Sequence, residues 1–571
     1  NDRWSENPEI AFNYAKSLVN YSAKQEEVEA RKTIDELKVF SDQWSENSDI
    51  ALCYAISLVN LSTKQEQADT REATVGELKA LSDYWIKNPE IALRYSIGLF
   101  NLSNKQEKVE ARNTVDKLKT LSEQWLKNPE IALEYAKSLV NLSNKQEERV
   151  ARETISELKT LNEQWSENPG IALMYANGIV NLSYIQGSDT ACQTISELKE
   201  LSDKWDRNPE IALRYASGLF NLSNKQEEVE ACKTINKLKE LSDKWDSNPE
   251  IALRYASGLF NLSNKQEKVE ARKTINKLKE LSDKWSENLG IALEYAKSLV
   301  NLSNKQKERV ARETISELKT LNDRWSENPE IALEYAKGLV NLSYVQGSDT
   351  ACQTISELKE LSDKWDRNPE IALRYASGLF NLSNKQDEDE ARQTIDKLKA
   401  FSGQCSKNPK IAIVYAESLF NLSIRQDEVA ARRTIDELKV FSGQWYKKYN
   451  IALLHAASLV NLSAKQEGAI AHQTVDELKA IYNQHPKNLK IAFEYAKGLF
   501  NLLVKQEGVA ARQTVDELLE LCSQQPQILR IMLQFVKNRV NHLRKQKTPD
   551  ALRAKTNLEL LIQNLETPGN S

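Results

Sequence analysis

The chain has few of the residues that build catalytic and metal sites. Its 571 residues include only 4 His, 6 Cys and 2 Met. The cysteines lack the spacing of metal ligands or of a disulfide framework. The chain also holds no Gly-rich phosphate loop, no Gly-x-Ser-x-Gly and no His-Glu-x-x-His. We therefore expect no metal, no cofactor and no active site, and the sequence predicts a protein that is not an enzyme.

Long apolar runs are absent, and glycine and proline are scarce. No stretch approaches the roughly 18 apolar residues of a membrane-spanning helix, and no signal-peptide pattern is present, so we expect no membrane contact. With 17 Gly, 13 Pro, 40% hydrophobic and 28% charged residues, the composition is typical of a helix-rich folded protein. We expect all six cysteines to be free thiols, which suits a cytoplasmic location.

One sequence unit recurs along the whole chain. Its fourteen copies begin at Ile10, Ile50, Ile91, Ile131, Ile171, Ile211, Ile251, Ile291, Ile331, Ile371, Ile411, Ile451, Ile491 and Ile531. The period is 40 residues, with one step of 41 residues between Ile50 and Ile91. A fixed period of this length is the signature of a solenoid. We number positions within a repeat from its isoleucine, so Asn221 is at position +10 of the repeat at Ile211.

The first half of the repeat predicts a helix that is buried on most sides. Asn208, Pro209 and Glu210 supply the N-cap, the first-turn proline and the acidic first turn of a helix. Polar residues at positions +3, +6, +10, +13 and +14 gather within an arc of about 100°. We expect this first helix to pack between neighbours and to expose only that narrow strip.

The second half of the repeat predicts an outer helix with one apolar stripe. Ala231, Ile235, Leu238, Leu241 and Trp245 recur at helical spacing among charged residues. All eleven tryptophans occupy the last of these positions: Trp4, Trp44, Trp85, Trp125, Trp165, Trp205, Trp245, Trp285, Trp325, Trp365 and Trp445. We expect each to close the core between one second helix and the next first helix, although a base-stacking row is the alternative.

These residues carry a resemblance to a known family. The Leu-x-Tyr-Ala-x-Gly-Leu run, the Lys-Gln turn, the alanine that opens the second helix and the Asn-Pro before the next helix resemble the tetratricopeptide repeat. The resemblance covers nearly all of the chain. The unit nevertheless has 40 residues, where that family has about 34, and Trp-x-x-Leu-Gly is missing. The resemblance implies a groove for a protein ligand, lined by the first helices.

The sequence thus predicts an all-α protein, a right-handed α-solenoid (superhelix) of about 14 two-helix repeats. We assign residues 1–7 to the end of a preceding repeat, 8–530 to thirteen tandem repeats, 531–565 to a C-terminal capping repeat and 566–571 to a tail. Because the chain opens within a repeat, we expect it to be cut from something longer. The ends of such a stack also allow end-to-end self-association.

The polar strip of the first helices gathers basic residues. Positions +3, +6, +13 and +14 together hold 23 basic and 5 acidic residues, although the whole chain has a net charge of −4. Such a field attracts acidic ligands. The candidate ligand-binding residues on this strip are Asn101, Asn141, Asn181, Asn221, Asn261, Asn301, Asn341, Asn381, Arg94, Arg214, Arg254, Arg374, Lys137, Lys297 and Lys337.

Each part of the strip also has a structural interpretation. The asparagines at +10 form either a ladder between neighbouring repeats or a row of donors and acceptors for the backbone of an extended peptide. Lysines at +14 can offset the C-terminal end of the first helix's dipole. Glutamates at +3 can pair with lysines at +6, one turn later. The sequence leaves these alternatives open.

The leading hypothesis is a non-catalytic scaffold for protein–protein interaction. Its concave groove would hold an extended acidic polypeptide, with asparagine on the backbone, Arg or Lys on the carboxylates, and avidity from repetition. One alternative is a solenoid that binds single-stranded nucleic acid, which the acidic outer surface and the lack of aromatic residues on the strip disfavour. Another is the sensor arm of a larger enzyme whose catalytic domain precedes residue 1.

Overall fold

The chain folds into helices throughout the part that the structure describes. The computed structural model describes residues 7–405, 408–445, 447–543 and 549–566. These residues form 28 helices and no strand, which confirms the prediction of an α-solenoid. The chain divides into two compact units, residues 1–295 and 296–571, and each is described by itself. Trp4, residues 544–548 of the predicted capping repeat and residues 567–571 of the predicted tail lie outside the described residues, whereas Glu566, which was assigned to the tail, ends the last helix.

The helices alternate between the first and the second helix of each repeat. The first helices are α1 (Pro8–Lys24), α3 (Ser48–Lys64), α5 (Pro89–Lys105), α7 (Pro129–Ser143), α9 (Pro169–Ile185), α11 (Pro209–Lys225), α13 (Pro249–Lys265), α15 (Leu289–Ser303), α17 (Pro329–Val345), α19 (Pro369–Ser383), α21 (Pro409–Arg425), α23 (Tyr449–Lys465), α25 (Leu489–Leu503) and α27 (Pro526–Leu543). Helix α15 spans the boundary between the two units.

The second helices follow after short turns. They are α2 (Glu27–Gln43), α4 (Ala68–Tyr84), α6 (Lys108–Gln124), α8 (Glu148–Gln164), α10 (Ser188–Lys204), α12 (Glu228–Lys244), α14 (Lys268–Lys284), α16 (Glu308–Arg324), α18 (Ser348–Lys364), α20 (Glu388–Gln404), α22 (Glu428–Gln444), α24 (Gly468–Gln484), α26 (Gly508–Gln524) and α28 (Pro549–Glu566).

Local sequence sets where the helices begin. At the start of α11, the Oδ1 atom of Asn208 accepts hydrogen bonds from the backbone N–H groups of Glu210 at 3.0 Å and Ile211 at 3.2 Å. Pro209 fills the first helical position, where no N–H partner is needed. The same asparagine cap recurs at most first helices, for example at Asn128 and Asn368. The Asn-Pro signal therefore predicted these boundaries correctly.

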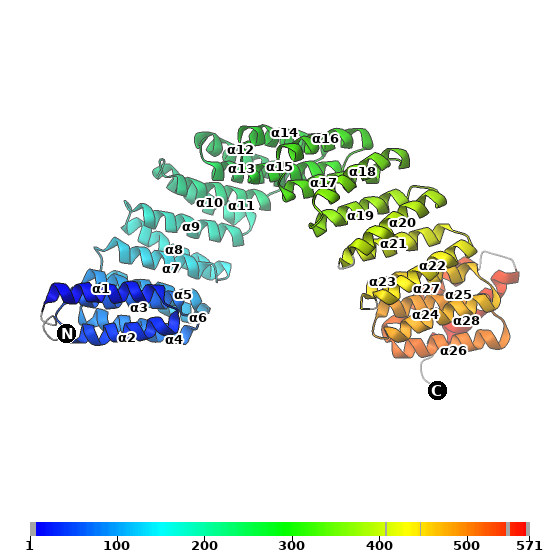
Figure 1. Cartoon of the computed structure of the whole chain (residues 1–571), viewed down its shortest axis with the longest axis horizontal. Coiled ribbons are helices and arrows are strands. Elements are labelled where there is room, and N and C mark those ends of the chain that lie inside the picture. The colour runs from blue at the N-terminus through cyan, green and yellow to red at the C-terminus, as the bar shows by residue number, and fades with distance from the viewer. Residues whose placement is uncertain (1–6, 406–407, 446, 544–548, 567–571) are drawn as a thin grey trace. The chain divides into compact units, whose positions relative to one another are not determined.

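Within each unit the helix pairs stack side by side (Figure 1). Helix α11 packs against the first helices α9 and α13 and against the second helices α10 and α12. Second helices of neighbouring repeats do not pack directly on each other in the described residues, except α26 and α28. First helices are therefore the tightly packed layer, and a groove separates each second helix from the next.

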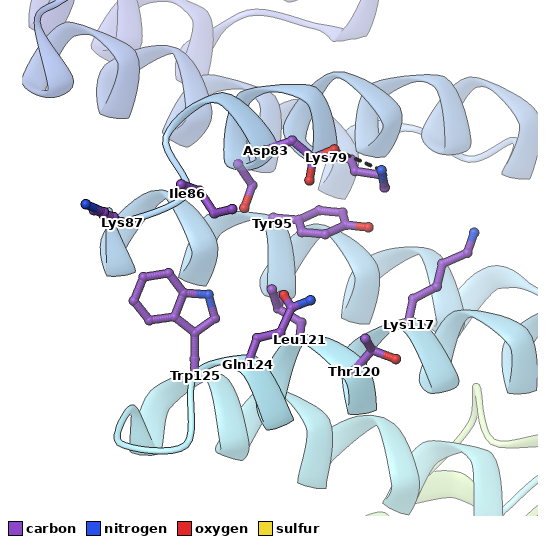
Figure 2. Close-up of a pocket in the computed structure, with 11 residues that line it drawn as sticks. Lys79, Asp83, Ile86, Lys87, Tyr95, Lys117, Thr120, Leu121, Gln124 and Trp125 are labelled. Atoms are coloured by element: carbon purple, nitrogen blue, oxygen red, sulfur yellow. Dashed lines mark hydrogen bonds and ion pairs between the residues drawn. The ribbon is translucent and has the colours of Figure 1, made fainter.

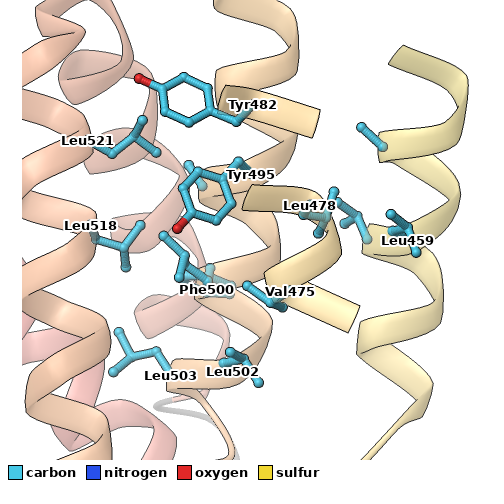
Figure 3. Packing of buried hydrophobic residues seen from close by; sticks show 14 of the residues in the cluster. Leu459, Val475, Leu478, Tyr482, Tyr495, Phe500, Leu502, Leu503, Leu518 and Leu521 are labelled. Carbon is cyan, nitrogen blue, oxygen red and sulfur yellow. The ribbon is translucent and has the colours of Figure 1, made fainter. Parts of the chain in front are cut away.

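The core consists of short aliphatic layers shared by neighbouring repeats. In residues 296–571, Leu459 of α23, Leu478 of α24 and Leu499 of α25 are at most 1% exposed and belong to one cluster. Figure 3 shows Leu459 and Leu478 in this cluster. Tyr482 and Tyr495 stack within it with ring centroids 5.5 Å apart. Because every layer draws on two adjacent repeats, a repeat is stable only beside its neighbours.

The tryptophans are less buried than the sequence suggested. All ten described ones are half-buried, and each is the C-cap residue directly after a second helix. The Trp125 backbone N–H donates to Leu121 and its carbonyl accepts from the N–H of Asn128. One edge of the ring faces the outer groove. Each tryptophan therefore closes the turn to the next repeat as much as it closes the core.

A buried threonine–glutamine hydrogen bond fixes the turn inside nearly every repeat. Thr234 Oγ1 donates to Gln226 Oε1 at 2.6 Å, and eleven other repeats contain the same pair. The repeat with the 41-residue step differs, because its extra residue moves Thr74 out of reach and leaves Gln65 Oε1 buried without a partner. Arg71 compensates by donating to the carbonyls of Gln65 and Asn101.

Position +4 is tyrosine in most repeats, but it is His455 in α23. This histidine is 4% exposed, and its Nε2 atom has no hydrogen-bond partner. Burial lowers the pKa of His455 to about 4, against the opposing effect of the nearby Glu477 carboxylate. The unfolded chain binds this proton below a pH of about 6.5, whereas the folded chain binds it only at much lower pH.

Acidification is therefore expected to destabilise the repeat at Ile451. Between pH 6.5 and pH 5 the free energy of unfolding should fall by roughly 2 kcal/mol because of His455 alone. The His455→Tyr variant should lose this component, since its new hydroxyl can donate to Glu477 as Tyr415 does to Glu437. Denaturant unfolding of both proteins at the two pH values measures the difference, and equal pH dependence would contradict the assignment.

Candidate functional site: the face of the first helices

The predicted strip lies on the exposed side of the first helices, but it is wider than predicted. Positions +3, +6 and +10 are half-buried in most repeats. Leucine at +2 and phenylalanine at +9, which the pattern assigned to the core, are half-exposed beside them, as Leu213 and Phe220 illustrate. The strip thus combines polar and apolar side chains, and it does contain aromatic residues. The periodicity missed them because apolar positions at the edge of a buried arc look the same as buried ones.

The asparagines at +10 bond to the preceding repeat through their amide nitrogens. Asn381 Nδ2 donates to the Val340 carbonyl at 3.3 Å and to Ser343 Oγ at 3.0 Å. Related bonds are made by Asn101, Asn141, Asn221, Asn261 and Asn341. Asn181 and Asn301 occupy the same half-buried position.

The amide oxygens of these asparagines face outward. In the described part of the chain, no protein group donates a hydrogen bond to Oδ1 of Asn221, Asn341 or Asn381. None of these oxygens is among the buried unsatisfied atoms. The amide nitrogen of each of these asparagines therefore has a structural role, and the amide oxygen remains a hydrogen-bond acceptor on the strip.

The basic residues at +14 clamp the preceding repeat. Lys225 Nζ donates to the carbonyls of Ser183 at 2.7 Å, Tyr184 at 2.5 Å and Gln186 at 2.5 Å, at the C-terminal end of α9. Burial lowers the pKa of Lys225. Corresponding bonds are made by Lys64, Lys145, Lys265, Lys385, Arg425, Lys465 and Lys505. These cations offset the dipole of the preceding first helix, so the charge counted from the sequence overstates what a ligand would meet.

The lysines at +6 are mostly paired within their own helix. Lys137 lies 2.6 Å from the carboxylate of Glu134, and Lys337 lies 2.6 Å from that of Glu334. Both glutamates are 7% exposed. Lys297 occupies the same position in the repeat at Ile291. The one-turn pairing considered from the sequence is therefore present at Lys137 and Lys337, and it neutralises these sites.

The arginines at +3 are the basic residues of the strip that keep their charge available. No carboxylate of the described residues lies within ion-pair distance of Arg94, Arg214 or Arg254, whereas Arg374 is 3.7 Å from Glu370. The Nε atoms of Arg94, Arg214 and Arg374 are buried without partners. Burial holds the stem of each side chain, while the half-exposed guanidinium faces outward.

The repeats thus fall into two kinds. We call those at Ile91, Ile211, Ile251 and Ile371 arginine repeats, since they carry arginine at +3 and half-exposed phenylalanine at +9. We call those at Ile131, Ile291, Ile331 and Ile491 glutamate repeats, since they carry glutamate at +3 and lysine at +6. This division was visible in the sequence as a correlation between positions of one repeat.

The arginine repeats combine a group that can bind a carboxylate with half-exposed apolar side chains of the same helix. The guanidinium forms paired hydrogen bonds to carboxylates, and Leu213 and Phe220 of α11 are half-exposed as well. Among the described residues, no group of three or more His, Cys, Asp or Glu is placed to hold a metal ion. None of the described helices is long and apolar enough to span a bilayer.

No protein-family model and no curated protein matches the chain. Among solved structures, it is similar to Kap95p from a study of its binding to RanGDP, with 9% identity and a TM-score of 0.51, over 98% of this chain and 77% of that one. Importin-β crystallised in ammonium sulfate is also similar, with 9% identity and a TM-score of 0.49, over 99% and 85% of the two chains. At such identities the likeness concerns the fold alone. The likeness to Kap95p supports a helical-repeat solenoid, and the tetratricopeptide type stays a prediction.

Proposed function

We propose that this protein is a non-catalytic, protein-binding α-solenoid whose first helices hold an extended acidic polypeptide. Arg214 and Arg254 bind carboxylates of the ligand, and Leu213, Phe220 and their counterparts pack against its apolar side chains. The outward amide oxygens at +10 accept hydrogen bonds from its backbone. Binding along first helices is the mode that the tetratricopeptide resemblance implies, and it belongs to this proposal. A cytoplasmic location does too, and the six free thiols are compatible with it.

The adjacent arginines of α11 and α13 carry this proposal. They come from consecutive repeats, and neither has a protein carboxylate partner in the described residues. Packed helices lie about 8–10 Å apart, and an extended chain advances about 3.3 Å per residue. The preferred ligand therefore has acidic residues about three positions apart, with apolar residues between them. The fold is compatible with such a role, since Kap95p binds another protein, RanGDP.

Charge reversal at these arginines tests the proposal. The Arg214→Glu/Arg254→Glu variant should bind a fluorescein-labelled peptide, with Asp at every third position and Leu between, at least about 100-fold more weakly, because each charged hydrogen-bond partner contributes about 1.5–3 kcal/mol. Fluorescence anisotropy at low and high salt gives the affinity and its salt dependence.

A matched control carries the same charge change elsewhere. Arg149 and Arg309 are exposed on the second helices α8 and α16, so Arg149→Glu/Arg309→Glu should leave the affinity within about twofold, as expected for surface charges distant from the ligand. Loss of binding in both variants would point to non-specific attraction. Tighter binding of oligouridylate than of the acidic peptide would favour the nucleic-acid alternative, for which the half-exposed phenylalanines offer a stacking surface.

A further inference from the structure

The side of the solenoid formed by the second helices contains a recurrent tyrosine–glutamate pair. The tyrosine is at position +4 of the first helix, and the glutamate belongs to the second helix of the same repeat. The hydroxyl donates to the carboxylate in the pairs Tyr14–Glu36, Tyr54–Glu77, Tyr135–Glu157, Tyr175–Glu197, Tyr335–Glu357, Tyr415–Glu437 and Tyr495–Glu517.

These glutamates are also bound by cations that reach across the outer groove. Glu157 receives a hydrogen bond from Arg112 at 2.7 Å, and Lys119 lies 3.7 Å away, both on the preceding second helix α6. Burial alone would raise the pKa of Glu157, but the hydrogen bonds from Arg112 and Tyr135 outweigh it and lower the pKa. In these repeats the chain places a charged carboxylate of its own in the groove.

The four arginine repeats lack this carboxylate. The residue that corresponds to Glu157 is lysine in each of them: Lys117, Lys237, Lys277 and Lys397. Their tyrosines, Tyr95, Tyr215, Tyr255 and Tyr375, are at most 7% exposed, and their hydroxyls have no hydrogen-bond partner among the described residues. In the arginine repeats the groove therefore contains a phenol and a lysine, whereas the other repeats described above hold a glutamate at the position of this lysine.

The groove at Tyr95 is open and positively charged. It has a volume of about 860 Å³, and its lining includes Ile86, Lys87, Tyr95, Lys117 and Trp125. Figure 2 shows the Tyr95 hydroxyl pointing to the end of the groove where Lys79 and Lys117 stand, with Ile86 and Trp125 at the other end.

The polar groups of this groove can donate to a bound acceptor. Lys79 is paired with Asp83 at 2.9 Å, but neither Lys87 nor Lys117 has a carboxylate partner in the described part of the chain. Burial raises the pKa of Tyr95 to about 12, so its hydroxyl is protonated at neutral pH. The hydroxyl oxygen is not among the buried unsatisfied atoms, so it is accessible from the groove, and a bound carboxylate would accept hydrogen bonds from both the phenol and the ammonium group of Lys117.

We propose that this groove binds an acidic side chain of a partner polypeptide, which takes the place of the glutamate found in the other repeats. The carboxylate accepts from Tyr95 Oη and Lys117 Nζ, and an adjacent apolar side chain packs on Ile86, which is 73% exposed, and on Trp125. The carboxylate is the ligand of choice because this protein builds the same arrangement with its own glutamate. The site is on the second-helix side of the repeat, away from Arg214 and Arg254.

Carbodiimide cross-linking of a synthetic acetyl-Leu-Glu-Leu-Glu-Leu amide to the full chain tests this site. Cross-linking joins a carboxylate to a lysine that it contacts, and peptide mass spectrometry locates the bond. We expect at least about tenfold more cross-link at Lys117 than at Lys119, whose groove already holds Glu157, since a charged hydrogen bond contributes at least about 1.5 kcal/mol. Equal yields at the two lysines would overturn the proposal.

Three variants separate a built site from a reactive surface lysine. Tyr95→Phe removes only the hydroxyl and should lower the Lys117 yield about tenfold; an unchanged yield would overturn the proposal. Glu157→Lys opens the neighbouring groove and should gain cross-link at position 157. Arg214→Glu/Arg254→Glu should leave the Lys117 yield unchanged, so failure here and failure of the first-helix site are distinguishable. Competition by oligouridylate at equal charge, without competition by the free peptide, would also refute a carboxylate site.

Discussion

Replacing Lys225 by glutamate is expected to lower the free energy of unfolding of the surrounding repeats by roughly 4 kcal/mol, because it removes a half-buried cation and sets a carboxylate against three carbonyls. The wild-type ammonium group donates to Ser183, Tyr184 and Gln186 at the end of α9. Those carbonyls are among the groups that a helix cannot satisfy by itself. Hydrogen exchange followed by mass spectrometry should show faster exchange in α9 and α11, with distant repeats unchanged.

The chain contains its own controls for this effect. The repeats at Ile171 and Ile331 carry Ile185 and Val345 at +14, and the first helices that precede them, α7 and α15, have 15 residues and end at serine. Helices followed by a clamping lysine, such as α9 and α11, have 17 residues, whereas α19, whose clamping residue is Arg425, has 15. Lys225→Ile should therefore shorten α9 by about two residues and cost about 2 kcal/mol, whereas Ile185→Lys should lengthen α7. Unchanged exchange at the C-terminal end of α9 in Lys225→Ile would contradict the clamp.

Replacing Gly218 by leucine is expected to cost about 3 kcal/mol, because this glycine lies where α11 meets the preceding second helix α10. A Cβ atom at this position would lie 2.5 Å from Ile195 Cδ1 and 2.9 Å from Leu198 Cδ2. Both neighbours are well buried, so a branched side chain has no space to enter. Thermal and denaturant unfolding of the full chain measure the loss.

Gly218→Ala is the matched control. Six repeats carry serine at this position, for example Ser138 and Ser458, so one additional carbon can be accommodated by small shifts of the facing Ile and Leu side chains. Alanine also favours a helix over glycine by about 1 kcal/mol, which offsets the crowding. We expect its stability to stay close to that of the wild type. If leucine were tolerated equally well, the close packing of α10 and α11 would be wrong.

The sequence was sufficient for the architecture because period, caps and apolar spacing all repeat. Asn208 and Pro209 predicted a helix start, and the stripe from Ala231 to Trp245 predicted an outer helix with one buried side. The roles of individual polar residues could not be predicted in the same way. Lys225 and Arg214 look alike in a helical projection, but only Lys225 meets the carbonyls of the preceding repeat. A single-helix pattern carries no information on which neighbour covers each position.

One signal in the sequence could have predicted more of the site. Within this chain, arginine at +3 occurs together with phenylalanine at +9 and with lysine in place of the second-helix glutamate, as in Arg94, Phe100 and Lys117. Glu134, Val140 and Glu157 form the opposite set. This correlation separates the arginine repeats from those in which a second-helix glutamate pairs with the tyrosine at +4.

The lysine clamp sets an order in which the repeats can complete their folding during synthesis. A clamped first helix receives its final hydrogen-bond donors from the repeat that follows it in the chain, so during synthesis such a repeat stays incomplete until the next one has left the ribosome. We expect the repeats to complete their folding in order from the amino to the carboxyl end, each one after the next repeat has been translated. If a ribosome stalled before the clamping lysine was made, the last carbonyls of the preceding first helix would lack their hydrogen-bond donor.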